Sequence, residues 1–303
     1  MVHLVVSIYF VNKTNRSRDE RKIMNRKYKA TGIVLKGTSF KENDRLVTVL
    51  TPEYGLIRAL APGAKKHKSQ LRGRTQLFVV NELLLLQGRS LDKIIQADTL
   101  YTYPGLSRDL GKLAAAQYLA ELSLALAIDE QPQPELYELL NEHLRRVEAF
   151  KIGDSVYPYL AQAVFHLSAI AGLTPQVFDC CASQKTVSFD LNSSGIGFSF
   201  EGGGIIDLEA VTTIQKQPEL DEEENYNLRM PKINYRINGV ELAILQQLNH
   251  RQFSTELFAT KNDRFNLETA WIRIERILRE YIQYHIGRTI RSANLVDNLY
   301  AEF

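Results

Sequence analysis

Between Lys29 and about Tyr103, apolar and polar residues alternate with a period of two, which is typical of half-buried β-strands. A turn at Pro52-Glu53-Tyr54-Gly55 has proline and glycine where β-turns favour them. The alternation predicts five short strands, at Thr31–Lys36, Asp44–Thr51, Leu56–Ala61, Gln76–Leu86 and Leu91–Thr99. Five strands with little helical pattern between them favour a small barrel, and the five-stranded OB-fold is the leading candidate.

After residue 108 the pattern changes to that of helices. Asp109–Ile128 is apolar on nearly every side, which predicts a buried helix. Glu135–Phe150 has apolar residues at the i, i+3, i+4 spacing of a helix with one buried face. Further helices are predicted at Pro158–Ala171, Val240–Leu248 and Leu267–Tyr284, whereas residues 173–235 show no sustained period.

These patterns predict an α+β chain of two domains, in agreement with a length of 303 residues. Residues 26–105 form the predicted OB-fold domain. Residues 106–303 form a helical domain with an irregular insertion at about 176–235. Residues 1–25 are interpreted as a disordered N-terminal extension or as a mis-assigned start, because Met24 stands just before the first regular pattern.

Charge is distributed unevenly along the chain, although the net charge is only +2. Residues 1–110 contain 20 Lys and Arg against 9 Asp and Glu, a net charge of +11. The remaining residues contain 17 against 26, a net charge of −9. Such an asymmetry suggests that the N-terminal domain binds a polyanion.

The strongest local feature is a basic loop after Pro62-Gly63. Five cations fall within ten residues of this loop: Lys65, Lys66, Lys68, Arg72 and Arg74. Lys and Arg neutralise nucleic-acid phosphates, and the release of counterions gives affinity that does not depend on sequence. We therefore expect DNA contacts here, with Arg45 and Arg58 as supporting charges. The simpler interpretation is a solvated basic loop without a ligand.

Aromatic residues on the flanking segments extend this hypothesis. Tyr54 and Phe78 lie on either side of the basic loop in the sequence, and bases of a single strand could stack on their rings. The end of the last long helix adds a weaker candidate. Arg288 and Arg291 follow it and are possible secondary DNA contacts.

The last long helix itself has a regular charge pattern. Trp271, Ile274, Leu278 and Tyr281 form an apolar stripe along it. Two i, i+4 pairs, Glu275 with Arg279 and Arg276 with Glu280, predict a salt-bridged face toward solvent.

Catalytic and metal motifs find little support. The two cysteines, Cys180 and Cys181, are adjacent, which excludes a secreted disulfide scaffold and suits a reducing cytosol. Ser183 follows Cys180 where a zinc pair needs a second cysteine, so no zinc site is expected. Glu42 and Asp44 lack further ligands nearby in sequence, and an Asp44–Arg45 turn pairing is the better interpretation of these residues.

Other function classes lack their signatures. His166 lies in an apolar helix and is interpreted as a packed core histidine. The sequence contains no Gly-Lys-Ser/Thr phosphate loop, Gly-x-Ser-x-Gly elbow or His-Glu-x-x-His helix, so an enzyme is not expected. No apolar run approaches the roughly 18 residues that a membrane span needs.

From about Tyr28 to Leu299 the chain resembles the RecO family of bacterial DNA repair proteins. The resemblance rests on short runs: Gly32-Ile33-Val34-Leu35, Glu42-x-Asp44-Arg45-Leu46-Val47, Tyr54-Gly55-Leu56, Gly63-Ala64-Lys65-Lys66, Tyr118-x-x-Glu121-Leu122, Gly172-Leu173-x-Pro175, Tyr281-x-x-Tyr284-His285 and Arg291-Ser292. The family combines an N-terminal OB-fold with a helical body and, in many members, an inserted zinc module.

The resemblance implies a non-enzymatic recombination mediator in the cytoplasm, associated with the nucleoid. Such a protein binds single- and double-stranded DNA and anneals complementary strands. It acts with RecR to load RecA onto strands covered by single-strand-binding protein. One departure concerns zinc: a second cysteine pair should follow Gly203-Gly204, where Ile205-Ile206-Asp207-Leu208 stands. The expected protein therefore has no cofactor.

Two other hypotheses remain open from the sequence. In the first, the protein is an interaction adaptor whose helical domain binds the acidic tail of a partner, with DNA binding secondary. In the second, it is a metal-dependent nuclease, which the absence of clustered carboxylates near the basic loop disfavours.

Overall fold

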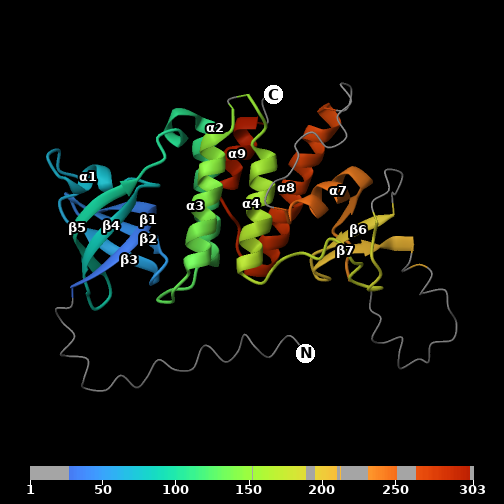
Figure 1. Cartoon of the computed structure of the whole chain (residues 1–303), viewed down its shortest axis with the longest axis horizontal. Coiled ribbons are helices and arrows are strands. Elements are labelled where there is room, and N and C mark those ends of the chain that lie inside the picture. Colours follow the sequence, from blue (N-terminus) through green and yellow to red (C-terminus); the bar gives the residue numbers. More distant parts are fainter. Residues whose placement is uncertain are drawn as a thin grey trace, which may run out of the picture. The chain divides into compact units, whose positions relative to one another are not determined.

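The computed structural model describes residues 27–151, 153–188, 195–209, 212, 231–250 and 264–300, without the side chains of 264–266 and 300. The interpretation of residues 1–25 lies outside this range. Contacts divide the chain into two compact units (Figure 1). We call them the barrel unit, Met1–Val49 with Ile57–Leu100, and the helical unit, Leu50–Leu56 with Tyr101–Phe303.

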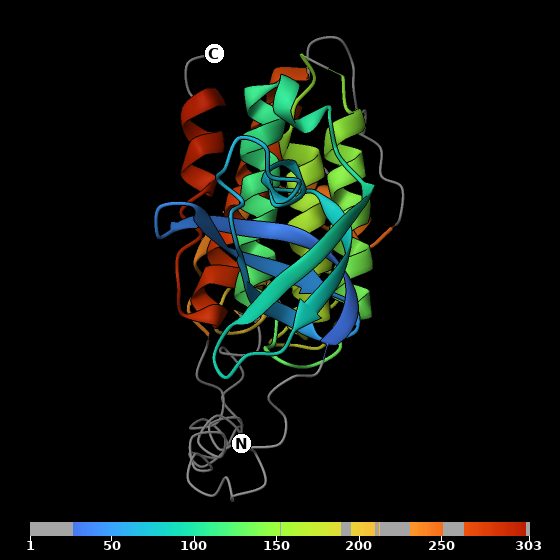
Figure 2. The ribbon, with the colours of Figure 1, turned by 90° about the vertical axis from the view of Figure 1, so that its left-hand side faces the viewer.

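Five strands form a closed barrel in the order β1-β2-β3-β5-β4, which confirms the predicted OB-fold (Figure 2). The strands are β1 (Lys27–Phe40), β2 (Asp44–Thr51), β3 (Gly55–Ala61), β4 (Val80–Leu86) and β5 (Asp92–Tyr101). The barrel closes where β1 pairs antiparallel with β4, with Lys27 opposite Leu86. β3 and β5 run parallel, with Ala59 opposite Asp92.

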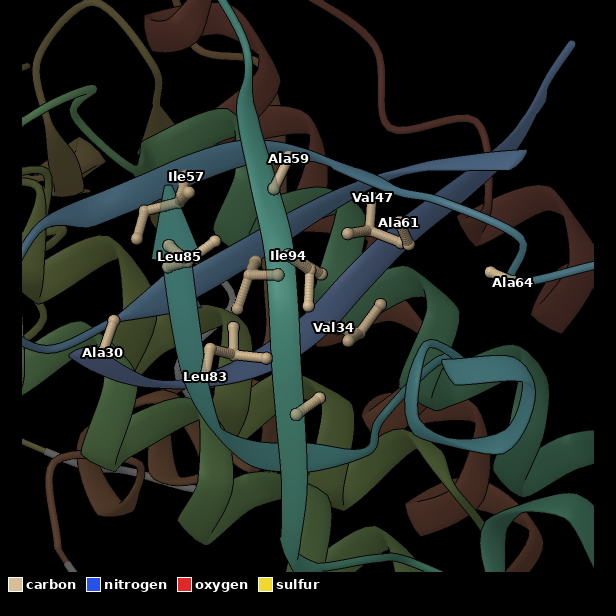
Figure 3. Close-up of a cluster of buried hydrophobic side chains, with 12 residues drawn as sticks. Ala30, Val34, Val47, Ile57, Ala59, Ala61, Ala64, Leu83, Leu85 and Ile94 are labelled. Carbon is tan, nitrogen blue, oxygen red and sulfur yellow. The ribbon is translucent and has the colours of Figure 1, made fainter. Parts of the chain in front are cut away.

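The barrel core follows the period of two seen in the sequence. On β3, Ile57, Ala59 and Ala61 are buried, and Arg58 between them is exposed. Side chains from all five strands converge in the interior, including Leu85 and Ile94 (Figure 3). Alternate burial therefore directs Arg58 outward from the barrel.

One predicted strand is partly wrong. The sequence pattern indicates a strand from Gln76, but β4 begins at Val80 and a short helix, α1 (Leu71–Arg74), precedes it. Phe78 is buried with φ at +64°, and its N–H donates to the carbonyl of Val34 at 2.8 Å. This left-handed backbone interrupts the extended chain, since a strand requires negative φ.

The helices predicted after residue 108 are present in the helical unit. Its longer elements are α2 (Leu110–Leu126), α3 (Pro134–Ala149), α4 (Tyr157–Ile170), α7 (Gly239–Gln247), α8 (Arg264–Ile286) and α9 (Ala293–Tyr300), with a 3-10 turn, η2 (Leu106–Arg108). α4 packs on α8 and α3, and α2 packs on α3, α4 and α9 (Figure 1). Among the described residues, no helix is long and apolar enough to span a membrane.

A small antiparallel sheet lies in the predicted insertion and just beyond its end. It contains β6 (Ile196–Ser199), β7 (Gly204–Asp207) and β8 (Tyr235–Ile237), in the order β7-β6-β8. At Gly204 a Cβ atom would lie 2.1 Å from the carbonyl oxygen of Gln176, so this approach requires glycine.

The last long helix was predicted to have two salt-bridged pairs facing solvent, and the prediction is wrong for the pair Glu275 and Arg279. Glu275 and Arg279 are buried, and Arg279 also donates to Asp297 Oδ2 on α9 at 2.9 Å. Glu275 accepts a 2.8 Å hydrogen bond from the Tyr118 hydroxyl on α2. This pair is therefore an internal connection among three helices, which spacing along one helix could not reveal.

Candidate nucleic-acid interface

The basic loop begins in a fixed conformation. Gly63 has φ at +65°, and its N–H donates to the carboxylate of Asp44 at 2.8 Å. The N–H of Lys65 donates to the Asn43 carbonyl at 2.9 Å, while Ala64 between them is buried in the barrel core. The β1–β2 connection thus holds the start of the loop.

The end of the loop is held by side chains of the barrel. Arg45 Nη1 donates to the Thr75 carbonyl at 3.0 Å, and Asn81 Nδ2 donates to the Arg74 carbonyl at 2.8 Å. Asn81 is fully buried and accepts in turn from Thr99. Sequence reasoning missed Asn81, because an isolated polar residue at a strand start carries no motif.

Between these ends the chain forms consecutive turns. Lys66 N–H donates to the Gly63 carbonyl, Ser69 N–H to Lys66, and Arg72 N–H to Ser69, at 2.9–3.1 Å. α1 then completes the segment. The loop therefore has hydrogen bonds between successive backbone segments along its length.

Five of the seven predicted DNA contacts present their charge to solvent: Arg58, Lys65, Lys66, Lys68 and Arg72. Four of these lie on the basic loop, and Arg58 lies on the outer face of β3. A conformation fixed before binding reduces the entropy lost on binding, so a pinned set of cations suits an anionic polymer.

The other two predicted contacts are engaged within the barrel. Arg74 donates to the Ala97 carbonyl and forms a 3.2 Å salt bridge with Asp98 on β5. Arg45 is half-buried and holds Thr75 as described above. Asp44 and Arg45 therefore do not form the expected turn pairing with each other. Asp44 holds the start of the loop, and Arg45 holds its end.

The predicted stacking residues also differ. Phe78 is 5% exposed, so its ring cannot serve as a stacking surface. Tyr54 is 41% exposed, but its segment clusters with the helical unit rather than with the barrel unit. The barrel site is therefore defined by its cations.

The secondary candidates lie in the helical unit. Arg288 and Arg291 are exposed, and Arg288 Nη2 donates to the Leu124 carbonyl on α2 at 3.0 Å. Near them Glu121 accepts from the N–H of Ser292 at 2.7 Å. Burial opposes ionisation of Glu121, but the Ser292 hydrogen bonds and the charge of Arg291 lower the pKa of its carboxyl. Arg291 thus helps to keep Glu121 charged.

In the cysteine region, the thiol of Cys180 accepts hydrogen bonds from the surrounding backbone. The buried Sγ of Cys180 accepts from the N–H of Asp207 at 3.2 Å and of Ser183 at 3.4 Å. Burial raises the pKa of this thiol, but these hydrogen bonds together outweigh burial and lower it. Zinc needs four thiolate, imidazole or carboxylate ligands. No group of three or more such residues that could hold a metal occurs in the described part of the chain.

Comparisons with known proteins agree with the order of these parts. Residues 24–103 match the family described as "Recombination protein O N terminal", and residues 107–236 match "Recombination protein O C terminal". A protein of Gloeothece citriformis named DNA repair protein RecO is 56% identical over 280 residues, covering 91% of this chain and 98% of the relative. Relatives of the same name from Nostoc sp. and Nostoc punctiforme are 50% and 47% identical, each covering 92% of this chain and 98% of the relative.

Proposed function

Because the chain belongs to the RecO family, and so has a role in DNA repair and recombination, we propose that it is a DNA-binding recombination mediator. In this proposal it binds single- and double-stranded DNA and anneals complementary strands. With RecR it helps to load RecA onto single strands covered by single-strand-binding protein. It performs these steps in the cytoplasm, at the nucleoid, without catalysing a reaction.

The single observation that supports DNA binding is the pinned basic loop. Lys65, Lys66, Lys68 and Arg72 are exposed on a segment whose backbone is hydrogen-bonded at both ends. Lysine and arginine bind phosphate oxygens without reading base edges. The loop is therefore suited to hold a backbone of any sequence.

Annealing follows from the same electrostatics. Two complementary strands repel each other through their phosphates, and cations between the backbones reduce that repulsion. Because the contacts go to phosphates, the base edges stay available for pairing. No bond to DNA is made or broken, so the proposed activity needs neither a nucleophile nor a metal.

Protein partners are assigned to the other part of the chain. Residues 111–303 have a net charge of −9, which confines contact between this part and DNA to local clusters of cations. We assign RecR and single-strand-binding protein to the helical unit for this reason. If bare oligonucleotide binds only when a partner is present, the adaptor hypothesis replaces this one.

The test is the salt dependence of binding to two unrelated labelled oligonucleotides, followed by fluorescence anisotropy. Substitution of Lys65, Lys66 and Lys68 by alanine should weaken binding to both sequences alike. For single strands the slope of log K against log salt should decrease in magnitude by about 2, at roughly 0.7 per phosphate contact. Loss for one sequence only would contradict phosphate recognition.

A matched control separates the loop from overall charge. Lys27, Lys29 and Lys93 are also exposed on the barrel strands, and their replacement by alanine removes the same charge. This control should keep most of the affinity; an equal loss in both triple variants would overturn the assignment to the loop. Labelled DNA incubated with the protein and Mg²⁺ should remain uncut, whereas cleavage would favour a nuclease.

A further inference from the structure

The outward face of α8 carries an aromatic ring and two arginines in register. Arg273, Arg276, Glu280 and Tyr284 recur every three or four residues, so they share one side of the helix. Arg273, Arg276 and Tyr284 are exposed. The 12 residues from Arg273 to Tyr284 are separated by 11 helical steps, which extend about 16 Å along the axis.

β8 adds a third arginine beside this face. Arg273 Nη2 donates to the Arg236 carbonyl at 3.0 Å, and the Tyr235 hydroxyl donates to Glu280 at 2.6 Å. Arg236 is exposed, and with Arg273 it lines a hollow of about 240 Å³ at the start of α7. Three guanidinium groups therefore lie along the α8–β8 junction.

The carboxylates of this junction are already engaged. Glu241, which is buried, forms a 2.6 Å salt bridge with Arg273 Nε and closes the capping box of α7 through Asn238. Glu280 accepts from Tyr235. Within the described residues, the side chains of Arg236 and Arg276 donate no hydrogen bond, so these two can bind an external anion.

Tyr284 is an exposed ring in a fixed position. It is 56% exposed, yet Phe200 and His285 contact it, with ring centroids 5.9 and 5.1 Å away. His285 Nε2 donates to the Phe200 carbonyl at 3.1 Å, which joins the end of α8 to the turn that follows β6. A rigid exposed aromatic ring beside cations is the combination that single-stranded nucleic acids use, with bases on rings and phosphates on arginine.

We propose that Arg236, Arg273, Arg276 and Tyr284, called here the α8 face, bind a second single strand of DNA. Arg236 and Arg276 contact phosphates and Tyr284 stacks on a base. The proposal rests on the proposed function, because it takes the barrel loop as the site of the first strand. A single strand is favoured over a duplex, since only unpaired bases expose their faces for stacking.

Two sites on separate units of one chain have a consequence for annealing. A protein that holds one strand on each unit converts the meeting of strands into an event within one complex, at an effective concentration set by the connection between them. The α8 face would thus contribute to annealing more than to affinity for a single oligonucleotide.

The test compares oligonucleotide stoichiometry, affinity and annealing rate across variants of the full chain. Tyr284→Ala should weaken the second binding event roughly tenfold, from the loss of one stacked base. Tyr284→Phe should bind as the wild type does, because the ring remains. An oligonucleotide with abasic positions should bind wild type and Tyr284→Ala with equal affinity at the second site.

Further arms separate this proposal from the proposed function. Arg236→Ala with Arg276→Ala should reduce stoichiometry from two strands to one and slow annealing, while the barrel-loop triple variant loses the other strand. Leu295→Ala, which changes an exposed residue of α9, is the matched control in the helical unit.

Unchanged stoichiometry in the Tyr284 and arginine variants would overturn the α8 face alone. Unchanged binding in the loop variant would overturn the barrel site alone. If the variants lose binding to an acidic peptide but keep binding to DNA, the face is a protein contact and the proposal is overturned.

Discussion

At the scale of single residues, Gly55 shows how closely one position can be constrained. It has φ at +64°, and a Cβ atom would lie 2.3 Å from the carbonyl oxygen of Gln131 and 2.6 Å from that of Ile128. Both oxygens belong to the backbone and cannot rotate away. Within the helical unit, the Pro52 carbonyl also accepts from the N–H of Gln133 at 3.0 Å.

We expect Gly55→Ala to reduce the free energy of unfolding by at least about 2 kcal/mol, from the left-handed backbone together with the clash. Urea unfolding followed by fluorescence of Trp271, the single tryptophan and a buried residue of the helical unit, measures the effect. The matched control is Gly287→Ala, where φ is +68° and no atom lies within 4 Å of the added Cβ. Equal losses in both variants would show that the clash contributes nothing.

The same scale shows the limit of sequence reasoning at the site. Seven cations could be identified from their spacing, but their environments could not. Arg74 and Lys68 are indistinguishable by sequence pattern, yet Arg74 pairs with Asp98 on β5 and Lys68 is exposed. Partners more than twenty residues away in the chain determine this difference. Phe78 was assigned to stacking for the same reason, because neither its burial nor its positive φ leaves a local signal.

At the scale of elements, a hydrogen-bonded histidine pair joins α3 to α4. His166 Nε2 lies 2.8 Å from the Leu248 carbonyl, and its Nδ1 lies 3.2 Å from His143 Nε2. The carbonyl only accepts, so His166 Nε2 carries the proton and its Nδ1 accepts from His143. Burial lowers the pKa of His166 and so favours the neutral ring that this arrangement uses. His166 is half-buried and hydrogen-bonded, so its interpretation as a packed core histidine is confirmed only in part.

Burial is the largest cause that lowers the pKa of both histidines, and Arg146 adds to it. Glu142, also nearby, opposes the shift for His166. Because the unfolded chain binds protons near pH 6.5 and the folded chain does not, stability should fall as pH decreases from 7 toward 5.5. The loss should reach roughly 1 kcal/mol for the buried His143 and should be smaller for the half-buried His166.

The measurement compares urea midpoints at several pH values for wild type and His143→Gln. The variant should show a flatter dependence over this pH range. Burial raises the pKa of Glu275 to about 7, which contributes the opposite slope, but equally in both proteins. Parallel curves for the two proteins would rule out the histidine pair as the cause.

Strands and helices could be predicted where their hydrophobic pattern repeated often enough to be recognised. Strands and helices with three or more repeats were identified, and β2 matches its predicted bounds. α9 was missed because it is short and, among its described side chains, only Ala293 and Val296 are buried. The α8 charges were misplaced because an i, i+4 pair looks the same whether it faces solvent or, as for Glu275 and Arg279, a neighbouring helix.

At the scale of the whole molecule, the α+β architecture and its order could be predicted, since the change from period two to helical period is abrupt. The exact division of the chain between the two units could not be predicted. Leu50–Leu56 reads as part of a barrel hairpin, but its contacts group it with the helical unit. Long-range contacts decide such membership, and no local pattern reports them.

In both units, early residues contact residues much later in the chain, and this has a consequence for synthesis on the ribosome. The barrel needs β4 and β5 to pair with β1 and β3, so it can close once about residue 101 has emerged. The helical unit joins α2 to the end of the chain, through Glu121 with Ser292 and through Tyr118, Glu275, Arg279 and Asp297. It must therefore wait for nearly the last residue.

Ribosome-bound chains of increasing length should consequently gain resistance to protease in two separate steps. The barrel should become resistant first, and the helical unit only when residue 297 has left the exit tunnel. Resistance of the helices in chains that end before Ser292 would contradict this order. The earliest part of the protein able to meet DNA would then be the basic loop, while the remainder of the chain is still being made.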